Sequence, residues 1–179
     1  MSFTLLNTDS NFQEKLRTAI SNSNVNSKLY LVVGFSLLLL YIVQLTLQLK
    51  FHFLVELQHD TLYKQTTGYL LLLYVGYQFK LARARKDTKS MRYHFSLHKI
   101  QGVFAPLVLY IHSMELGYAY QVLLSSLFLT NCLLGLLSPQ QFKLRNVSYV
   151  NCWLILHVSV ALLIVALALY HLFVTYWYS

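Results

Sequence analysis

Two apolar runs of the chain, residues 93–115 and 151–177, each contain a pair of histidines separated by thirteen residues. These histidines are His98 and His112 in the first run and His157 and His171 in the second. Fourteen helical positions at about 100° each fall about 40° short of four full turns. Both histidines of a pair would therefore share one helix face, about 21 Å apart along the axis. Two such helices side by side would form two stacked sites.

The composition of the chain places these runs in a membrane. Of its 179 residues, 56% are hydrophobic and only 11% are charged, and several apolar runs are long enough to cross a bilayer. We predict an all-α integral membrane protein, a five-span helical bundle in contact with membrane lipid. The predicted spans are residues 29–49, 67–80, 93–115, 118–137 and 150–176.

The segment before the first span, residues 1–27, is polar. One face of a short helix there would be apolar, which predicts an amphipathic helix on the membrane surface. The residues of that face are Phe12, Leu16, Ala19 and Ile20. Residues 28–179 then form the transmembrane domain, with a polar connection containing His52 and Lys64 between the first two spans.

The basic residues divide unevenly between the two ends of the predicted spans. Only Lys50 and Lys64 fall on one side, and twelve of the fourteen lysines and arginines fall on the other. Those twelve are Lys15, Arg17, Lys28, Lys80, Arg83, Arg85, Lys86, Lys89, Arg92, Lys99, Lys143 and Arg145. The positive-inside rule then predicts a cytoplasmic N-terminus and a C-terminus on the opposite side. No basic stretch is interleaved with aromatic residues, so a nucleic acid partner is not expected.

With five spans, the third and fifth helices are parallel. His98 would then lie at the same depth in the membrane as His157, and His112 at the same depth as His171. Each level would offer one imidazole from either helix, which is how a haem iron is held from both axial sides in a helix bundle. We predict two b-type haems with these four histidines as metal ligands, and residues 28–179 as a dihaem cytochrome b domain. A lone intramembrane histidine more often makes a helix-to-helix hydrogen bond, and zinc would need further ligands at the same depth.

Four other residues are candidates for binding the haems. Gly102, one helical turn after His98, would let a flat macrocycle approach the backbone closely. Pro106 leaves the carbonyl of Gly102 without its helical partner, so a kink is tolerable there. The anionic propionates prefer cationic donors. Those expected at the basic end are Lys99, Arg92 and Arg145.

The third span, with LHKIQG at residues 97–102 and His112 at its end, resembles the His-Arg/Lys-x-x-Gly…His helix of the ferric reductase-like transmembrane domain. That family includes ferric reductases and NADPH oxidases. The fifth span, with Trp153-x-x-Leu156-His157…His171, is similar to the second haem helix of that family. Residues 67–83 resemble the helix that precedes the first haem helix of the family. The resemblance covers about residues 62–176. The same histidine spacing also resembles cytochrome b of the respiratory quinol-oxidising complexes.

Both resemblances imply transmembrane electron transfer, by a haem subunit of a membrane oxidoreductase or by a small membrane reductase. The chain departs from the reductases in that it ends after the fifth span, where they continue into a flavin and nicotinamide domain. It has six glycines and no Gly-x-Gly-x-x-Gly fingerprint, so dinucleotide binding of the usual kind is not expected. We expect electron exchange with a partner redox protein or with quinol from the quinone pool. The alternative is a non-catalytic, haem-free structural or anchor subunit of a membrane complex.

Overall fold

The computed structural model of the chain describes residues 27–83, 88–139, 142 and 146–177. Within these residues the chain is helical and contains no strand, so the predicted all-α class is confirmed. The amphipathic helix predicted around Phe12 and Ile20 lies outside the described residues.

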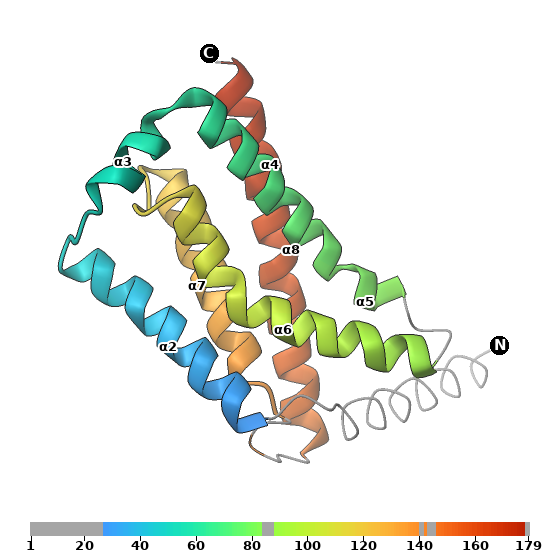
Figure 1. Ribbon diagram of the computed structural model, residues 1–179. Helices are drawn as coiled ribbons and strands as arrows, with labels where there is room; N and C mark the ends of the chain where they lie inside the picture. Colours follow the sequence, from blue (N-terminus) through green and yellow to red (C-terminus); the bar gives the residue numbers. More distant parts are fainter. Residues whose placement is uncertain (1–26, 84–87, 140–141, 143–145, 178–179) are drawn as a thin grey trace.

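A long helix overlaps each of the five apolar segments of the sequence (Figure 1). These helices are α2 (Ser27–Thr46), α4 (Thr61–Gln78), α6 (Thr88–His112), α7 (Tyr120–Leu136) and α8 (Val147–Trp177). Two short helices, α3 (His52–His59) and α5 (Lys80–Arg83), lie on either side of α4.

The segment between α2 and α4 is more ordered than the polar connection predicted there, because it contains α3. Asp60 separates α3 from α4, and its Oδ1 accepts a hydrogen bond from the backbone N–H of Tyr63 at 2.8 Å. An aspartate at this position satisfies one of the free N–H groups of a helix start. Helix α4 therefore begins at Thr61 rather than at Thr67, where the prediction placed it.

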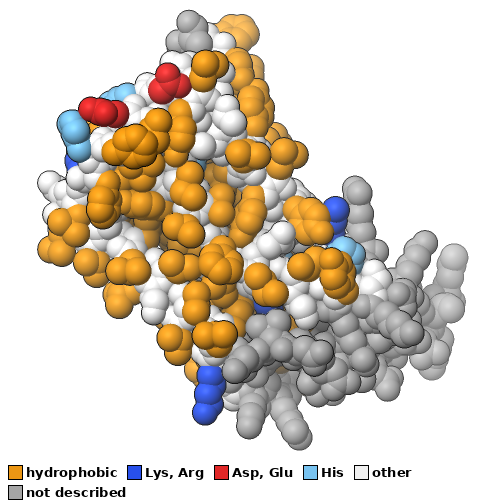
Figure 2. Space-filling model, viewed as in Figure 1, with side chains coloured by type: hydrophobic (Ala, Val, Ile, Leu, Met, Phe, Trp, Pro, Cys, Tyr) orange, Lys and Arg blue, Asp and Glu red, His pale blue; other side chains and the backbone are white. Residues whose placement is uncertain are grey.

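Two of the described helices, residues 28–46 of α2 and the whole of α8, are long and apolar enough to cross a bilayer. Helix α7 is also apolar but has 17 residues. Most of α8 is exposed, and Ile164 is its only fully buried residue. In the view of Figure 2, hydrophobic side chains cover the broad middle of the described surface, and charged side chains lie near its ends.

Helix α7 lies between α6 and α8 and is the main contact of α8, whereas α6 packs on α2, α4 and α7. The backbones of α6 and α8 scarcely approach each other, so these two helices meet through their side chains. The buried cluster at the centre of the bundle draws on α2, α6, α7 and α8. Its members are Tyr41, Ala105, Leu109, Phe128 and Ile164.

Helices α2 and α6 end on the same side of the bundle. The Tyr41 hydroxyl donates to the carbonyl of Ser113 at 3.0 Å, and Lys50 Nζ lies 2.6 Å from the Glu115 carboxylate in the loops beyond the two helices. The hydrogen bond to Glu115 raises the pKa of Lys50 above its ordinary value. Because α6 follows the same direction as α2, it carries His98 near one end of the bundle and His112 near the other. Figure 1 shows α6 bending along its course, and Pro106 lies in that helix.

Candidate functional site

The structure brings His98 of α6 beside His157 of α8. Their ring centroids are 6.1 Å apart and the ring planes are nearly perpendicular, at 89°. Two imidazoles that bind one metal ion from opposite sides place their centroids about 6 Å apart, because each metal–nitrogen bond is about 2 Å, as in zinc sites. The two rings, which we call the inner pair, are therefore spaced for a shared metal ion.

The inner pair contains ring nitrogens without hydrogen-bond partners. The Nδ1 atoms of His98 and His157 are buried and make no hydrogen bond within the described part of the chain. The His98 ring also forms a hydrogen bond with the backbone of Gln78, but this bond does not involve Nδ1. Buried polar atoms nearly always have a partner, and neutral imidazole is the commonest metal ligand in proteins. The orphaned nitrogens thus fit a ligand that uses imidazoles.

An indole ring supports the inner pair from within α8. Trp153 stacks on His157 with centroids 5.3 Å apart and an interplanar angle of 7°. The indole is fixed in turn, because Nε1–H donates to the carbonyl of Leu134 on α7 at 2.8 Å. Trp153 was singled out in the sequence only as part of a motif. Its position four residues before His157 could have indicated the contact, since residues four apart share a helix face.

The second pair, His112 and His171, is held by hydroxyl groups, and we call it the outer pair. Nδ1 of His112 lies 3.0 Å from Thr67 Oγ1 on α4, and Nδ1 of His171 lies 3.1 Å from the Tyr120 hydroxyl on α7. Both rings lie at the same end of the bundle, because His112 contacts Thr67 of α4 and Tyr176, five residues after His171, contacts Tyr69 of α4. Sequence reasoning missed both hydroxyl contacts, because each joins helices whose relative rotation the spacing of residues does not specify.

The two pairs meet in ascending order along both helices. His98 precedes His112 on α6, and His157 precedes His171 on α8, so α6 and α8 run in the same direction. The residues that the sequence predicted to share a depth are thus neighbours. Their binding of metal remains a prediction.

The end of α6 beside His112 is closed by side chains from α3 and α4. Gln58 Nε2 donates to the carbonyls of Tyr110 and Ile111 at 2.9 and 3.1 Å, and the Tyr63 hydroxyl donates to the carbonyl of Ile111 at 2.9 Å. The last carbonyls of a helix lack partners within it. These bonds supply partners for two of them, and so help to fix the position of His112.

Two glycines pack directly on the histidines. A Cβ added to Gly68 would lie 3.2 Å from Cε1 of His112, and one added to Gly135 would lie 3.7 Å from Cε1 of His157. The first distance is tighter than ordinary contact, whereas the second is normal. Gly68 on α4 therefore lets the His112 ring approach the backbone of that helix.

Two further glycines, Gly102 on α6 and Gly76 on α4, face open space. A Cβ at Gly102 or at Gly76 would meet no atom within 4 Å. Gly102 lies one turn beyond His98 on α6, and a hydrogen bond from the Tyr74 hydroxyl to the Gln101 carbonyl brings α4 against α6 at this level. The open space at Gly102 lies where the sequence predicted close approach of a macrocycle.

The cationic residues predicted to bind propionates are described only in part. Lys99 is buried, with its ammonium 5.5 Å from the Tyr30 ring centroid and 5.2 Å from that of Phe95. Aromatic faces attract a cation at such distances. Arg145 lies outside the described residues, and of Arg92 only the backbone in α6 is described.

The ligand chemistry of the site favours a group that needs two protein ligands. Within the described residues, no three histidine, cysteine, aspartate or glutamate side chains converge. Structural zinc sites use four protein ligands and catalytic zinc sites use three, whereas a b-type haem takes two axial histidines.

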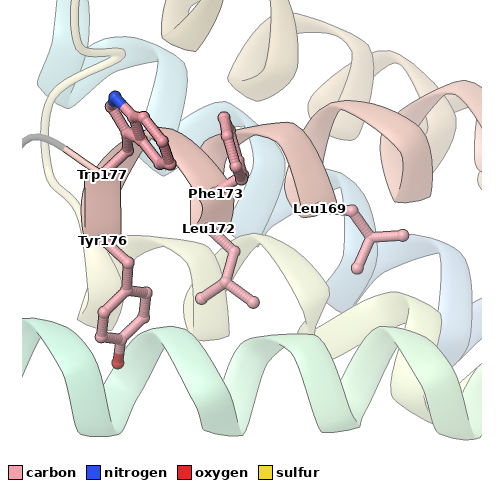
Figure 3. A pocket seen from close by; sticks show the side chains of 5 residues that line it. All are labelled: Leu169, Leu172, Phe173, Tyr176 and Trp177. Atoms are coloured by element: carbon pink, nitrogen blue, oxygen red, sulfur yellow. The ribbon is translucent and has the colours of Figure 1, made fainter.

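A groove of about 420 Å³ lies near the end of α8 (Figure 3). It is lined by residues of α8 alone: Leu169, Leu172, Phe173, Tyr176 and Trp177. In Figure 3 the Tyr176 side chain points toward α4, where its hydroxyl meets that of Tyr69 at 2.5 Å. The groove offers apolar and aromatic packing surface and no histidine.

The chain matches no protein-family model, and no curated protein or solved structure matches it significantly. The features that bear on function are therefore those of the chain itself. They are two imidazole pairs between α6 and α8, glycines beside them, and aromatic or hydroxyl side chains that hold the rings.

Proposed function

We propose that this chain is an integral membrane electron-transfer protein whose helices α6 and α8 hold two b-type haems. His98 and His157 would ligate the inner haem, and His112 and His171 the outer haem. The observation that carries the proposal is the inner pair, whose ring centroids at 6.1 Å match the spacing of two imidazoles on one metal ion. The outer pair lies fourteen residues further along each helix, so the same spacing in sequence supports a second site.

The proposed bundle crosses the membrane five times, through α2, α4, α6, α7 and α8. Lys28 at the start of α2 and Lys80 after α4 mark one end, while the Lys50–Glu115 ion pair marks the other. With the basic loop around residues 80–92, the positive-inside rule favours a cytoplasmic N-terminus and a C-terminus on the opposite side.

The residues around the pairs fit a flat macrocycle with two axial imidazoles. Gly102, one turn from His98, would leave room for a macrocycle there, and Gly68 allows close approach at the outer pair. Trp153 orients the His157 ring, and Thr67 and Tyr120 orient the outer rings. When bound, haem with two axial histidines supplies an iron that accepts and releases one electron and leaves no open position for oxygen.

The resemblance to the ferric reductase-like domain supports a role as the haem subunit of an oxidoreductase or as a small membrane reductase. Electrons would come from a separate redox protein or from quinol. The four imidazoles, at two depths about 21 Å apart along each helix, line a route between the two membrane surfaces. Lipid-exposed α8 and the apolar middle of the surface suit a membrane location.

A reduced-minus-oxidised absorption spectrum of the detergent-purified full chain, with a pyridine haemochrome count, tests the proposal. We expect a b-type spectrum and two haems per chain. His59→Ala, at an exposed position of α3, is the matched control and should retain both. A purified, folded chain without haem would overturn the proposal and favour the haem-free anchor subunit.

A second measurement separates a catalytic reductase from an electron-carrying subunit. Quinol alone is added to the purified dihaem protein, and turnover with an external acceptor is followed. Sustained turnover would identify a reductase. Haems that are reducible by dithionite but inert to quinol would identify a subunit that depends on a protein donor.

A further inference from the structure

We infer that Thr67 is a positioning residue for the outer haem, because it holds His112 in the tautomer whose Nε2 is free to bind iron. The inference rests on the proposed function, in which His112 is an axial ligand. It concerns a residue to which neither the histidine spacing nor the resemblance assigned a role at the iron.

The direction of the hydrogen bond follows from the number of protons available. Thr67 Oγ1 lies 2.7 Å from the carbonyl oxygen of Tyr63, 3.3 Å from that of Lys64 and 3.0 Å from Nδ1 of His112. A hydroxyl has one hydrogen to donate, and a carbonyl oxygen can only accept. The hydroxyl hydrogen therefore points to Tyr63, the nearest of the three. Toward His112 the hydroxyl oxygen acts as acceptor, so Nδ1 of His112 carries a hydrogen and donates it.

The proton on Nδ1 determines what the other ring nitrogen can do. A neutral imidazole carries one N–H, so Nε2 of His112 keeps a free lone pair. Metal-ligating histidines typically donate the opposite N–H to a fixed acceptor, which orients the ring and raises its basicity as a ligand. Thr67 provides such an acceptor before any metal is bound.

Gly68 completes the arrangement on the next residue of α4. A side chain there would begin 3.2 Å from Cε1 of His112, which is tighter than ordinary contact, so the ring would have to shift. The Thr67–Gly68 dipeptide thus combines an acceptor with the space that lets the ring reach it. We call this dipeptide the His112 seat.

The inner pair differs from the outer pair in that, within the described residues, no hydroxyl group meets Nδ1 of either ring. Neither His98 nor His157 has a hydrogen bond to Nδ1 within the described residues. A ligand made more basic by its N–H acceptor stabilises oxidised iron and lowers its reduction potential. Loss of the Thr67 hydroxyl should therefore raise the potential of the outer haem and leave that of the inner haem unchanged.

The first test uses the unaltered full chain without haem. Nitrogen-15 spectra of labelled histidine distinguish the Nδ1–H from the Nε2–H tautomer, and the His112 signal is assigned by its loss in His112→Ala. We expect Nδ1–H at His112. An Nε2–H tautomer there would overturn the inference whether or not the chain binds haem.

The second test compares Thr67→Val, Thr67→Ser and Thr130→Val in the haem-loaded protein by redox titration. Thr130 on α7 also donates to a carbonyl four residues earlier, at 2.8 Å, but is exposed and is described with no contact to a histidine. We expect Thr67→Val to shift one of the two potentials upward and to weaken retention of that haem roughly 10-fold. Thr67→Ser and Thr130→Val should leave both potentials in place.

The results separate the inference from the proposal on which it rests. A chain that binds two haems whose potentials do not change in Thr67→Val would overturn the role of Thr67 but keep the proposed function. A chain that binds no haem would overturn the proposed function, and the role of Thr67 at the iron with it. The nitrogen-15 spectrum would then still decide whether the predicted hydrogen bond exists.

Discussion

The inner and outer histidine pairs share a spacing but differ in their surroundings. Of the inner rings, His157 is stacked on Trp153, and both rings have a buried Nδ1 without a partner in the described residues. The outer rings are each bonded to a hydroxyl, from Thr67 and Tyr120. The helical repeat places the four imidazoles at two levels of the bundle, but the side chains around each ring, from α8 itself at His157 and from α4 and α7 at the outer pair, determine how it is held. Equal spacing therefore does not imply equal chemistry.

The two ends of the bundle also differ in charge. At the inner end, Lys99 is buried against aromatic rings beside the inner pair. At the outer end, the charge of Lys50 is matched by Glu115 in an exposed ion pair. A buried cation near the iron would favour the reduced state of the inner haem. The two regions should thus be distinguishable by experiment.

The largest expected effect comes from removing the ligands. His98→Ala and His157→Ala should each remove the same inner haem, and His112→Ala and His171→Ala the same outer haem. Each variant should retain about one haem per chain, because the other pair keeps both ligands. Haem counts and redox titrations identify which centre is lost. Different losses for His98→Ala and His157→Ala would show that the pairs are matched wrongly.

Replacing the aromatic support should affect the inner pair alone. In Trp153→Leu the His157 ring loses its stacking partner, so we expect roughly 10-fold weaker retention of the inner haem. Competition with a haem-accepting apoprotein measures the retention. Trp177→Leu is the matched control, because that indole is 71% exposed and stacks on Phe173 instead. Equal loss from both centres would mean that Trp153 supports the fold in general rather than one ring.

Gly102→Ala should act in opposite directions on the haem-free and haem-loaded protein. Without haem the new methyl enters open space, and replacing a mid-helix glycine with alanine stabilises by about 0.5–1 kcal/mol. With haem the methyl would occupy space needed beside the inner pair, so occupancy of that site should fall. Thermal unfolding and haem content measure the two effects. An unchanged haem content would show that no macrocycle lies against Gly102.

The order of the two potentials is expected to follow charge and hydrogen bonding together. Lys99 should raise the potential of the inner haem, and the hydroxyl acceptor at His112 should lower that of the outer haem. In redox titrations His112→Ala should therefore retain the higher of the two wild-type potentials. Retention of the lower one would contradict this order.

The smallest expected effect comes from the exposed ion pair. Glu115→Gln should leave both haems in place, because exposed ion pairs contribute little to stability. Glu115 raises the pKa of Lys50 from its ordinary 10.5, so the stabilisation is complete below that value and disappears as pH rises through the raised pKa. Wild type and variant should thus converge in thermal unfolding at strongly alkaline pH. A clear loss of outer haem in Glu115→Gln would give this ion pair a role at the outer site.

The parts of the fold that depend on local pattern could be predicted from the sequence. Apolar runs indicate α2, α7 and α8 because hydropathy is a property of neighbouring residues, and fourteen-residue spacing places two histidines on one face of α6. Helix α3 was missed because it is only eight residues long and contains His52, Glu56 and His59, which are typical of a polar connection between spans. The contact between Thr67 and His112 joins residues far apart in sequence, and the rotation of α4 against α6 decides it. Residue types alone do not specify that rotation.

Each proposed site takes one ligand from α6 and the other from α8, and the whole of α7 separates these helices along the chain. During synthesis, α6 emerges first with two imidazoles that have no opposing partners. The hydrogen bonds from Gln58 to the carbonyls at the end of α6 can already form at that stage, because α3 precedes α6. Under the proposed function, neither site would be complete until α8 has packed against α7. Cofactor capture would then be the final event in the biogenesis of this bundle, and an assembly intermediate lacking α8 would carry half of each site and retain neither haem.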